Sequence, residues 1–100
     1  MGKKRKFRVV NLGDIRLLYS PTILYHIQKH NVKLSEIISA LTGKTYRKRL
    51  KKNDWMYIGK TEAGRFLTIF LEQLGAGDFR LKTARDSTSV EKRIYKKLSK

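Results

Sequence analysis

Short runs rich in aromatic and β-branched residues fill the second half of the chain and are separated by small-residue turns. Trp55–Thr61, Arg65–Glu72 and Asp78–Arg85 are three such runs, joined by Glu62–Gly64 and by Leu74–Gly77. Connections this short can join only antiparallel neighbours, because a parallel pair of strands needs a crossover of about a dozen residues or more. The pattern therefore predicts a three-stranded antiparallel meander.

The two faces of this meander can be assigned because side chains along a strand point alternately to opposite sides. In the middle strand one face carries Leu67, Ile69 and Leu71, and the other carries Phe66, Thr68 and Phe70. In the last strand, strict alternation places Phe79, Leu81, Thr83 and Arg85 on the core face and Arg80, Lys82 and Ala84 opposite. We therefore expect Arg80 and Lys82 on the sheet surface that faces away from the helices.

Two helices are predicted before the meander. Ser20 can accept a hydrogen bond from the first turn of one helix, and Pro21 suits its first position. Asn31 stands where the chain leaves that helix, and asparagine tolerates the left-handed conformation of such a turn. The second helix is expected to start after Ser35 as its cap and to end at Gly43. The predicted apolar stripes are Ile23, Leu24 and Ile27 in the first helix and Ile37, Ile38 and Leu41 in the second.

A third, basic helix is predicted over Ser89–Leu98, directly after the meander. Thr88 and Glu91 have the spacing of a capping box, in which each side chain accepts a hydrogen bond from the backbone of the other. The spacing of its apolar residues predicts that Val90, Ile94 and Leu98 line one face, with Tyr95 beside them. Glu91 is therefore expected to have a structural role before any catalytic one.

The remaining segments leave alternatives open. Phe7–Leu12 and Ile15–Tyr19 are short apolar runs, of which at least one should be a strand and both could form a hairpin. Thr45–Leu50 lies in the most basic run of the chain and could be a strand paired with Trp55–Thr61, or a basic loop. Taken together, the elements predict a two-layer α+β domain over residues 15–100, preceded by a basic extension over residues 1–14.

Charge narrows the possible partners. The 100 residues include 24 lysines and arginines against 8 acidic residues, which gives a net charge of +16 and an isoelectric point near 10.4. Self-repulsion on this scale is tolerated where the partner is a polyanion, so nucleic acid, a ribosomal surface or an acidic protein is expected. The chain has no cysteine, in keeping with a reducing cytoplasm, and no apolar run of the roughly 20 residues that span a membrane.

Four segments occur in an order and spacing that resemble those of a known family. They are Lys29-His-Asn-Val32, Ile58-Gly-Lys-Thr-Glu-Ala-Gly-Arg-Phe-Leu67, Arg80-Leu-Lys-Thr-Ala-Arg85 and Glu91-Lys-Arg-Ile-Tyr95. Together they resemble the BrnT-type toxins of bacterial and archaeal type II toxin–antitoxin systems. The resemblance implies a RelE-like fold with an N-terminal strand and two helices, an antiparallel meander of three to four strands, and a C-terminal helix. It also implies a cytoplasmic endoribonuclease that is neutralised by a small antitoxin, for which a ribbon-helix-helix protein is a candidate.

The expected chemistry needs neither metal nor cofactor. The 2′-hydroxyl of RNA can attack the adjacent phosphate if an enzyme aligns it, stabilises charge on the phosphate oxygens and moves two protons. A guanidinium group matches two phosphate oxygens at once. The resemblance makes Arg80 and Arg85 the first candidates for this role, followed by Arg65, with Tyr95 as a further catalytic candidate. The expected RNA-binding residues are Arg47, Lys48, Arg49, Tyr57, Lys82 and Arg93.

Each of these interpretations has a plainer rival. The arginines could bind RNA or an antitoxin without accelerating a reaction. His26 and His30 are four residues apart and share a helix face, but we expect them to make structural hydrogen bonds, and no third metal ligand is suitably spaced. Two functions therefore remain: an endoribonuclease that acts on mRNA, free or on the ribosome, and a non-catalytic basic module that binds nucleic acid or an antitoxin.

Overall fold

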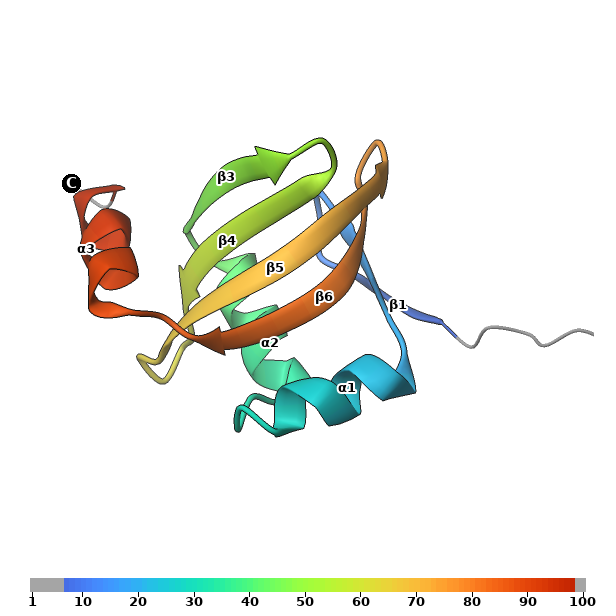
Figure 1. Cartoon of the computed structure of the whole chain (residues 1–100), viewed down its shortest axis with the longest axis horizontal. Coiled ribbons are helices and arrows are strands. Elements are labelled where there is room, and N and C mark those ends of the chain that lie inside the picture. Colours follow the sequence, from blue (N-terminus) through green and yellow to red (C-terminus); the bar gives the residue numbers. More distant parts are fainter. Residues whose placement is uncertain (1–6, 99–100) are drawn as a thin grey trace, which may run out of the picture.

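The computed structural model describes residues 7–98, which fold as a six-stranded mixed sheet and three helices (Figure 1). The strand order in the sheet is β1-β2-β6-β5-β4-β3. All neighbouring strands are antiparallel except β2 and β6, which are parallel. The elements, in chain order, are β1 (Arg8–Asn11), β2 (Arg16–Tyr19), α1 (Pro21–Gln28), α2 (Leu34–Thr42), β3 (Thr45–Lys51), β4 (Asp54–Lys60), β5 (Phe66–Gly75), β6 (Asp78–Asp86) and α3 (Ser89–Leu98).

The predicted meander is confirmed as β4, β5 and β6. Its two turns contain Gly64 and Gly77, whose positive φ angles of 96° and 82° suit a residue without a side chain. The basic run is a strand, β3, that extends the meander on its outer edge by pairing with β4. The α+β fold class is therefore correct, whereas the RelE-like arrangement of the parts remains an expectation.

The first strands form the other end of the sheet. The apolar runs before α1 are β1 and β2, which pair as the antiparallel hairpin that was one of the two expected outcomes. Residues 8–11 lie in the segment that we expected to be an extension, and they form the edge strand. Residues 1–6, the predicted basic tail, lie outside the described residues. β2 joins the meander by pairing in parallel with the start of β6, where Leu17 lies beside Phe79.

The ends of the first two helices follow local capping chemistry. Ser20 caps α1 and accepts a hydrogen bond from the Ile23 amide at 3.3 Å, as predicted. Asn31 adopts the expected left-handed conformation, with φ of 60°. The prediction of Ser35 as the cap of α2 was wrong, because the helix begins at Leu34 and Lys33 is its N-cap residue. The Lys33 amide donates instead to the Glu36 carboxylate at 3.0 Å, which satisfies the first turn without a serine.

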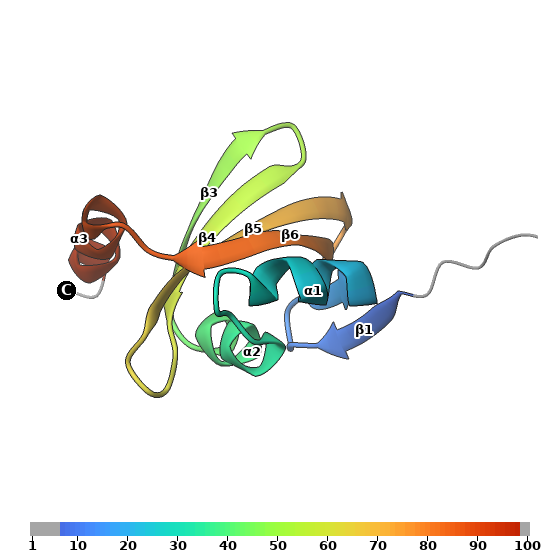
Figure 2. The same ribbon diagram turned by 60° about the horizontal axis from the view of Figure 1, so that its bottom comes forward.

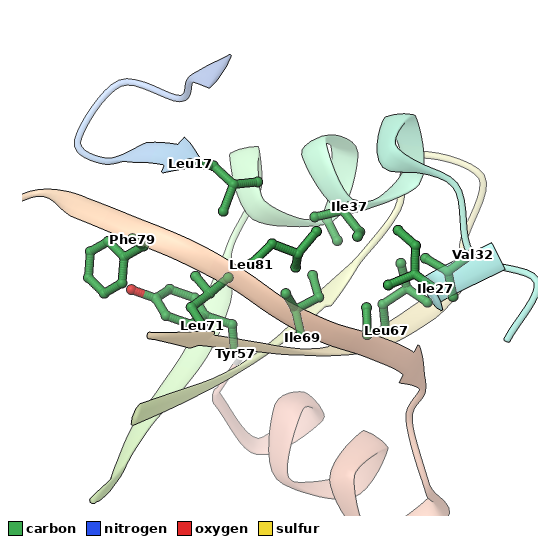
Figure 3. Packing of buried hydrophobic residues seen from close by; sticks show 12 residues of the cluster. Leu17, Ile27, Val32, Ile37, Tyr57, Leu67, Ile69, Leu71, Phe79 and Leu81 are labelled. Carbon is green, nitrogen blue, oxygen red and sulfur yellow. The ribbon is translucent and has the colours of Figure 1, made fainter. Parts of the chain in front are cut away.

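The hydrophobic core lies between the sheet and the pair α1 and α2 (Figures 2 and 3). Leu67, Ile69 and Leu71 are fully buried in it, as their common face predicted. Helix residues Ile27 and Ile37 cover them from one side, and Leu17 and Leu81 close the cluster. In the described part of the chain, no helix is long and apolar enough to cross a membrane.

Helix α3 packs on the opposite side of the sheet from α1 and α2 (Figure 3). The side chain that it buries is Tyr95, which contacts Phe66 edge-on with 5.6 Å between the ring centres. The prediction that Val90, Ile94 and Leu98 line the packed face of this helix was wrong for two of these residues, because Val90 and Leu98 are exposed. The reason is geometric: α3 covers only one end of the sheet, and the middle of the helix is the part in contact.

Candidate nucleic-acid interface

The surface of interest is the side of β3–β6 that faces away from α1 and α2, which we call the open sheet face. Strand register determines its residues, because side chains of directly paired residues lie on the same side of an antiparallel sheet. One row across the strands contains Lys48, Met56 and Phe70, and the next contains Tyr46, Ile58, Thr68 and Arg85. Helix α3 covers the end of this face near Phe66, and Ile58 and Thr68 in the second row are fully buried, whereas Met56 and Phe70 in the first row are half-buried.

A β-bulge in β6 changes which of its residues reach this face. Leu81 pairs with Leu71 and Thr83 pairs with Phe70, so Lys82 is an extra residue without a partner of its own in β5. Beyond the bulge the alternation is reversed. Ala84, which we expected opposite the core, is fully buried in it, and Arg85, which strict alternation would place on the core face, is on the open sheet face beside Thr68. Strict alternation cannot detect such an insertion.

The bulge therefore places all three basic residues of β6 on the open sheet face, each with an acidic partner. Arg80 forms an ion pair with Glu72, which lies opposite it in β5. The Arg80 Nε atom is buried and has no hydrogen-bond partner among the described residues. Lys82 reaches Asp54 at the end of β4, with 3.1 Å between Nζ and Oδ1.

Arg85 is held by the carboxylate that caps α3. Its two terminal nitrogens donate to the two oxygens of Glu91 at 2.9 and 3.0 Å. Glu91 Oε1 also accepts from the Thr88 amide and from Thr68 Oγ1, each at 2.8 Å, so the predicted capping box is confirmed and extended. The Arg85 hydrogen bonds, opposed by partial burial and assisted by the Thr88 and Thr68 donors, lower the pKa of Glu91 to about 2.

We expect Glu91→Gln to destabilise the protein by about 2 kcal/mol at neutral pH. The pKa of Glu91 falls from its usual 4.5 to about 2 on folding, so its contribution to stability is complete above pH 4.5 and is lost as the pH falls toward 2. Urea denaturation at pH 7 and pH 3 measures this change. The difference between the variant and the native protein should shrink at the lower pH. Glu62→Gln, in an exposed turn, is the control, and an equal loss in both variants would contradict the expectation.

Arg65, the third catalytic candidate, is a structural residue by its contacts. It immediately precedes β5 and donates to Asp86 at 2.7 Å, to the backbone oxygen of Asn31 at 2.7 Å and to Glu36 at 2.9 Å. These bonds connect the end of the meander to the turn between α1 and α2. Because its guanidinium group is occupied on the helix side of the sheet, Arg65 is not brought together with Arg80 and Arg85.

The two tyrosines that we selected are both buried. Tyr95 is 8% exposed, and its hydroxyl donates to the backbone oxygen of Lys44 at 3.1 Å. Tyr57 is 4% exposed and lies in the core against Phe79. The positions of these rings do not support the predicted proton-transfer role of Tyr95 or the predicted stacking role of Tyr57, since neither is open to a substrate. For Tyr57 in β4, a period-two pattern cannot distinguish an aromatic ring in the core from one on the surface.

The predicted RNA-binding residues of β3 divide between the two faces. Lys48 lies on the open sheet face beside Met56. Arg47 pairs with Tyr57 and Arg49 pairs with Trp55, so both belong to the opposite side, where the Arg49 guanidinium lies 5.6 Å from the centre of the Trp55 ring. Arg93 is exposed on α3. Of the residues selected from the sequence, the structure thus groups Lys48, Arg80, Lys82 and Arg85 on one surface.

A cluster of lysines around Phe66 was not predicted from the sequence. The ammonium groups of Lys60, Lys92 and Lys96 lie 5.4, 5.8 and 5.8 Å from the centre of the Phe66 ring. None of the three forms a salt bridge with a described residue. Two features of the sequence are consistent with this cluster: Lys92 and Lys96 share a helix face, and Lys60 precedes the turn that returns the chain to Phe66. The cluster could not be predicted from them, because the sequence does not show where α3 lies against the sheet. We call these residues the Phe66 lysine cluster.

The two histidines of α1 are stacked edge-on, with 5.6 Å between ring centres. His26 Nε2 lies 3.2 Å from Thr83 Oγ1, within hydrogen-bond distance, so the imidazole contacts β6. Across residues 7–98, no group of three or more histidine, cysteine or acidic side chains is placed to hold a metal ion. The open sheet face itself carries cations, aromatic rings and hydroxyl groups, together with the carboxylates of Asp54, Glu72 and Glu91 that pair with its basic residues.

No protein-family model, no curated protein and no solved structure significantly matches this chain. The resemblance to BrnT-type toxins accordingly rests on the four sequence segments alone. Function is therefore inferred from the geometry and charge of the open sheet face and of the Phe66 lysine cluster.

Proposed function

We propose that this protein binds single-stranded RNA, with the strand lying across the open sheet face and past α3. The observation that carries the proposal is the Phe66 lysine cluster, in which three ammonium groups surround one aromatic ring and form no salt bridge with a described residue. Like charges held this close repel one another, and an RNA phosphate placed among them removes that cost.

The aromatic side chains give the same surface a preference for unpaired bases. Phe66 and Phe70 lie on the same face of β5, four residues apart, which is about 13 Å along a strand. Both rings are half-buried and carry a cation: the lysine cluster at Phe66, and the Arg85 guanidinium 5.4 Å from the ring centre at Phe70. Two stacking rings with adjacent cations bind splayed bases and their phosphates, which a duplex does not present.

Lysine and arginine have different roles in this arrangement. The arginines of the open sheet face form ion pairs with Glu72 and Glu91. These ion pairs fix the positions of the guanidinium groups and weaken their electrostatic attraction for a phosphate. The cluster lysines and Lys48 supply the charge that RNA can neutralise. A net charge of +16 adds long-range attraction for any polyanion, so affinity alone is a weak test and strand preference is a sharper one.

Fluorescence anisotropy with a labelled 12-nucleotide RNA, alone and annealed to its complement, tests the proposal. We expect tighter binding of the single strand, and a salt dependence with a log–log slope of about −2 or steeper, since each phosphate contact to a single strand contributes about −0.7. Equal affinity for the single strand, the duplex and heparin would overturn the proposal, because it would indicate attraction to any polyanion.

The second candidate function is the metal-independent endoribonuclease implied by the resemblance, with an antitoxin as its natural inhibitor. The observation in its favour is that the bulge brings Arg80 and Arg85 to the same face. Their partners on β5, Glu72 and Thr68, are four residues apart, which is about 13 Å along a strand. A phosphate that displaced Glu91 would gain the Arg85 guanidinium, which could stabilise charge on its oxygens during attack by the 2′-hydroxyl. The described side chains of this face that can carry a proton include Glu72, Asp54 and Glu91, and each of these carboxylates is engaged in an ion pair with Arg80, Lys82 or Arg85.

Incubation of RNA with the purified protein in EDTA tests the second candidate. An enzyme should leave 2′,3′-cyclic phosphate ends, and Arg85→Lys should lose most of the turnover while RNA affinity changes little, because lysine keeps the charge but not the fork. The absence of cyclic ends over hours, together with retained binding, would leave a binding module, the rival that the sequence also allows.

A further inference from the structure

A cavity of about 410 Å³ lies between the start of α1 and the middle of β6, beside the open sheet face. It forms because the parallel pairing of β2 with β6 ends at Leu18 and Arg80, after which the chain turns into α1. The edge of β6 beyond this point faces the helix instead of another strand. The volume is in the range of small-molecule sites. The cavity is lined by Phe7, Ser20, Thr22, Ile23, His26, Arg80, Leu81 and Lys82.

The lining combines three kinds of group. Phe7, Ile23 and Leu81 supply apolar surface, Thr22 and His26 supply polar atoms, and Arg80 and Lys82 supply positive charge. Within residues 7–98, no carboxylate lines the cavity. The Ser20 hydroxyl already accepts a hydrogen bond from the Ile23 amide as the cap of α1. The polar character of the cavity therefore comes from its other lining residues. An apolar wall, hydrogen-bonding groups and two cations together match an aromatic base joined to a phosphate.

Arg80 and Lys82 belong both to this cavity and to the open sheet face, where they contact Glu72 and Asp54. The Arg80 Nε atom, buried and without an acceptor in the described part of the chain, is a donor that the ion pair with Glu72 leaves unused. A buried donor without an acceptor is costly, and an additional acceptor beside Arg80 would lower that cost.

We propose that this cavity accepts one nucleotide unit, with its base against the apolar wall and its phosphate at Arg80 and Lys82. The inference rests on the proposed function in one respect: the unit is part of an RNA strand that crosses the open sheet face and turns over β6. The same chemistry could come from a free nucleoside monophosphate, and the experiment separates these two sources.

The test compares two variants of equal size and charge on α1. Thr22→Trp fills the mouth of the cavity, whereas Gln28→Trp places the same side chain at the other end of the helix, and both positions are exposed. Circular dichroism and thermal melting confirm that each variant folds. We expect Thr22→Trp to weaken binding of a single-stranded RNA about tenfold, the effect of losing one stacked base, and Gln28→Trp to leave the affinity unchanged.

Adenosine monophosphate is the second probe, followed by NMR chemical-shift changes in the native protein. Shifts at Ile23 and Lys82 that disappear in Thr22→Trp support the cavity as a nucleotide site, even if the native protein were to bind no RNA strand and the proposed function failed. Native-like RNA affinity in Thr22→Trp, with no shifts from the mononucleotide, overturns the inference and leaves RNA binding on the open sheet face intact.

Discussion

Simultaneous replacement of Lys60, Lys92 and Lys96 by glutamine should weaken binding of single-stranded RNA about a hundredfold at roughly 0.1 M salt. Each ammonium group that contacts a phosphate releases about 0.7 of a counterion. Three such contacts therefore make the affinity about a hundredfold higher at roughly 0.1 M salt than at roughly 1 M salt. The slope of log affinity against log salt should become shallower by about two. All three side chains are exposed, and their loss should leave folding unchanged.

A matched variant separates this surface from the effect of overall charge. Arg8, Lys29 and Lys33 are exposed positions on β1 and beside α1 and α2, away from α3. Their replacement by glutamine removes the same three charges and should weaken binding by only a few-fold, through the long-range field. Anisotropy titrations of both variants at four salt concentrations measure the difference. Equal losses in the two would locate RNA binding in net charge and not in the Phe66 lysine cluster.

Gly59→Ala should destabilise the fold by about 3 kcal/mol, the largest change that we expect from a single methyl group in this chain. Gly59 lies in β4 directly beside Ala40 of α2. A β-carbon at this position would stand 2.5 Å from the backbone oxygen of Ala40 and 3.2 Å from the Ala40 side chain. A backbone carbonyl inside a helix cannot move aside, so α2 itself would have to shift away from the core.

Gly43→Ala is the control for Gly59→Ala. Gly43 ends α2 with φ of −98°, and a β-carbon there would meet no atom within 4 Å. We expect stability to be unchanged or raised by up to about 1 kcal/mol, because alanine restricts the unfolded chain. Urea denaturation followed by the fluorescence of Trp55, the single tryptophan, measures both variants. A loss below about 1 kcal/mol for Gly59→Ala would show that the helix is not held closely against β4.

Local sequence patterns were sufficient for most of the elements. Three strands, their turns, the helix starts at Ser20 and Thr88 and the left-handed residue Asn31 all follow from chemistry within a few positions, and the structure has them where the sequence predicts. Burial of Leu67, Ile69 and Leu71 follows from alternation in a regular strand. The last strand shows the limit of this reasoning, because one extra residue at Lys82 exchanges the faces of Ala84 and Arg85.

The candidate site was predictable only in part, since its residues come from elements that the sequence does not place together. The basic character of the surface and the presence of Arg80 and Lys82 on it follow from composition and alternation, whereas the place of Lys48 depends on the pairing of β3 with β4. The pairing of Arg85 with Glu91 and of Arg80 with Glu72 depends on how strands and α3 meet, and these ion pairs decide which cations are available to a ligand.

The amino-acid sequence by itself determined the net charge of +16, the three strands of the meander, and the helix starts at Ser20 and Thr88, because each depends on composition or on neighbouring residues. Only the tertiary structure decided that α3 lies across the sheet from α1 and α2, and that Tyr57 and Tyr95 are buried. It also decided that Lys60, Lys92 and Lys96 meet at Phe66. The physical reason is that these contacts join residues far apart in the chain, 51 positions in the case of Tyr95 and Lys44. Their geometry depends on how the packed layers meet and not on any local preference.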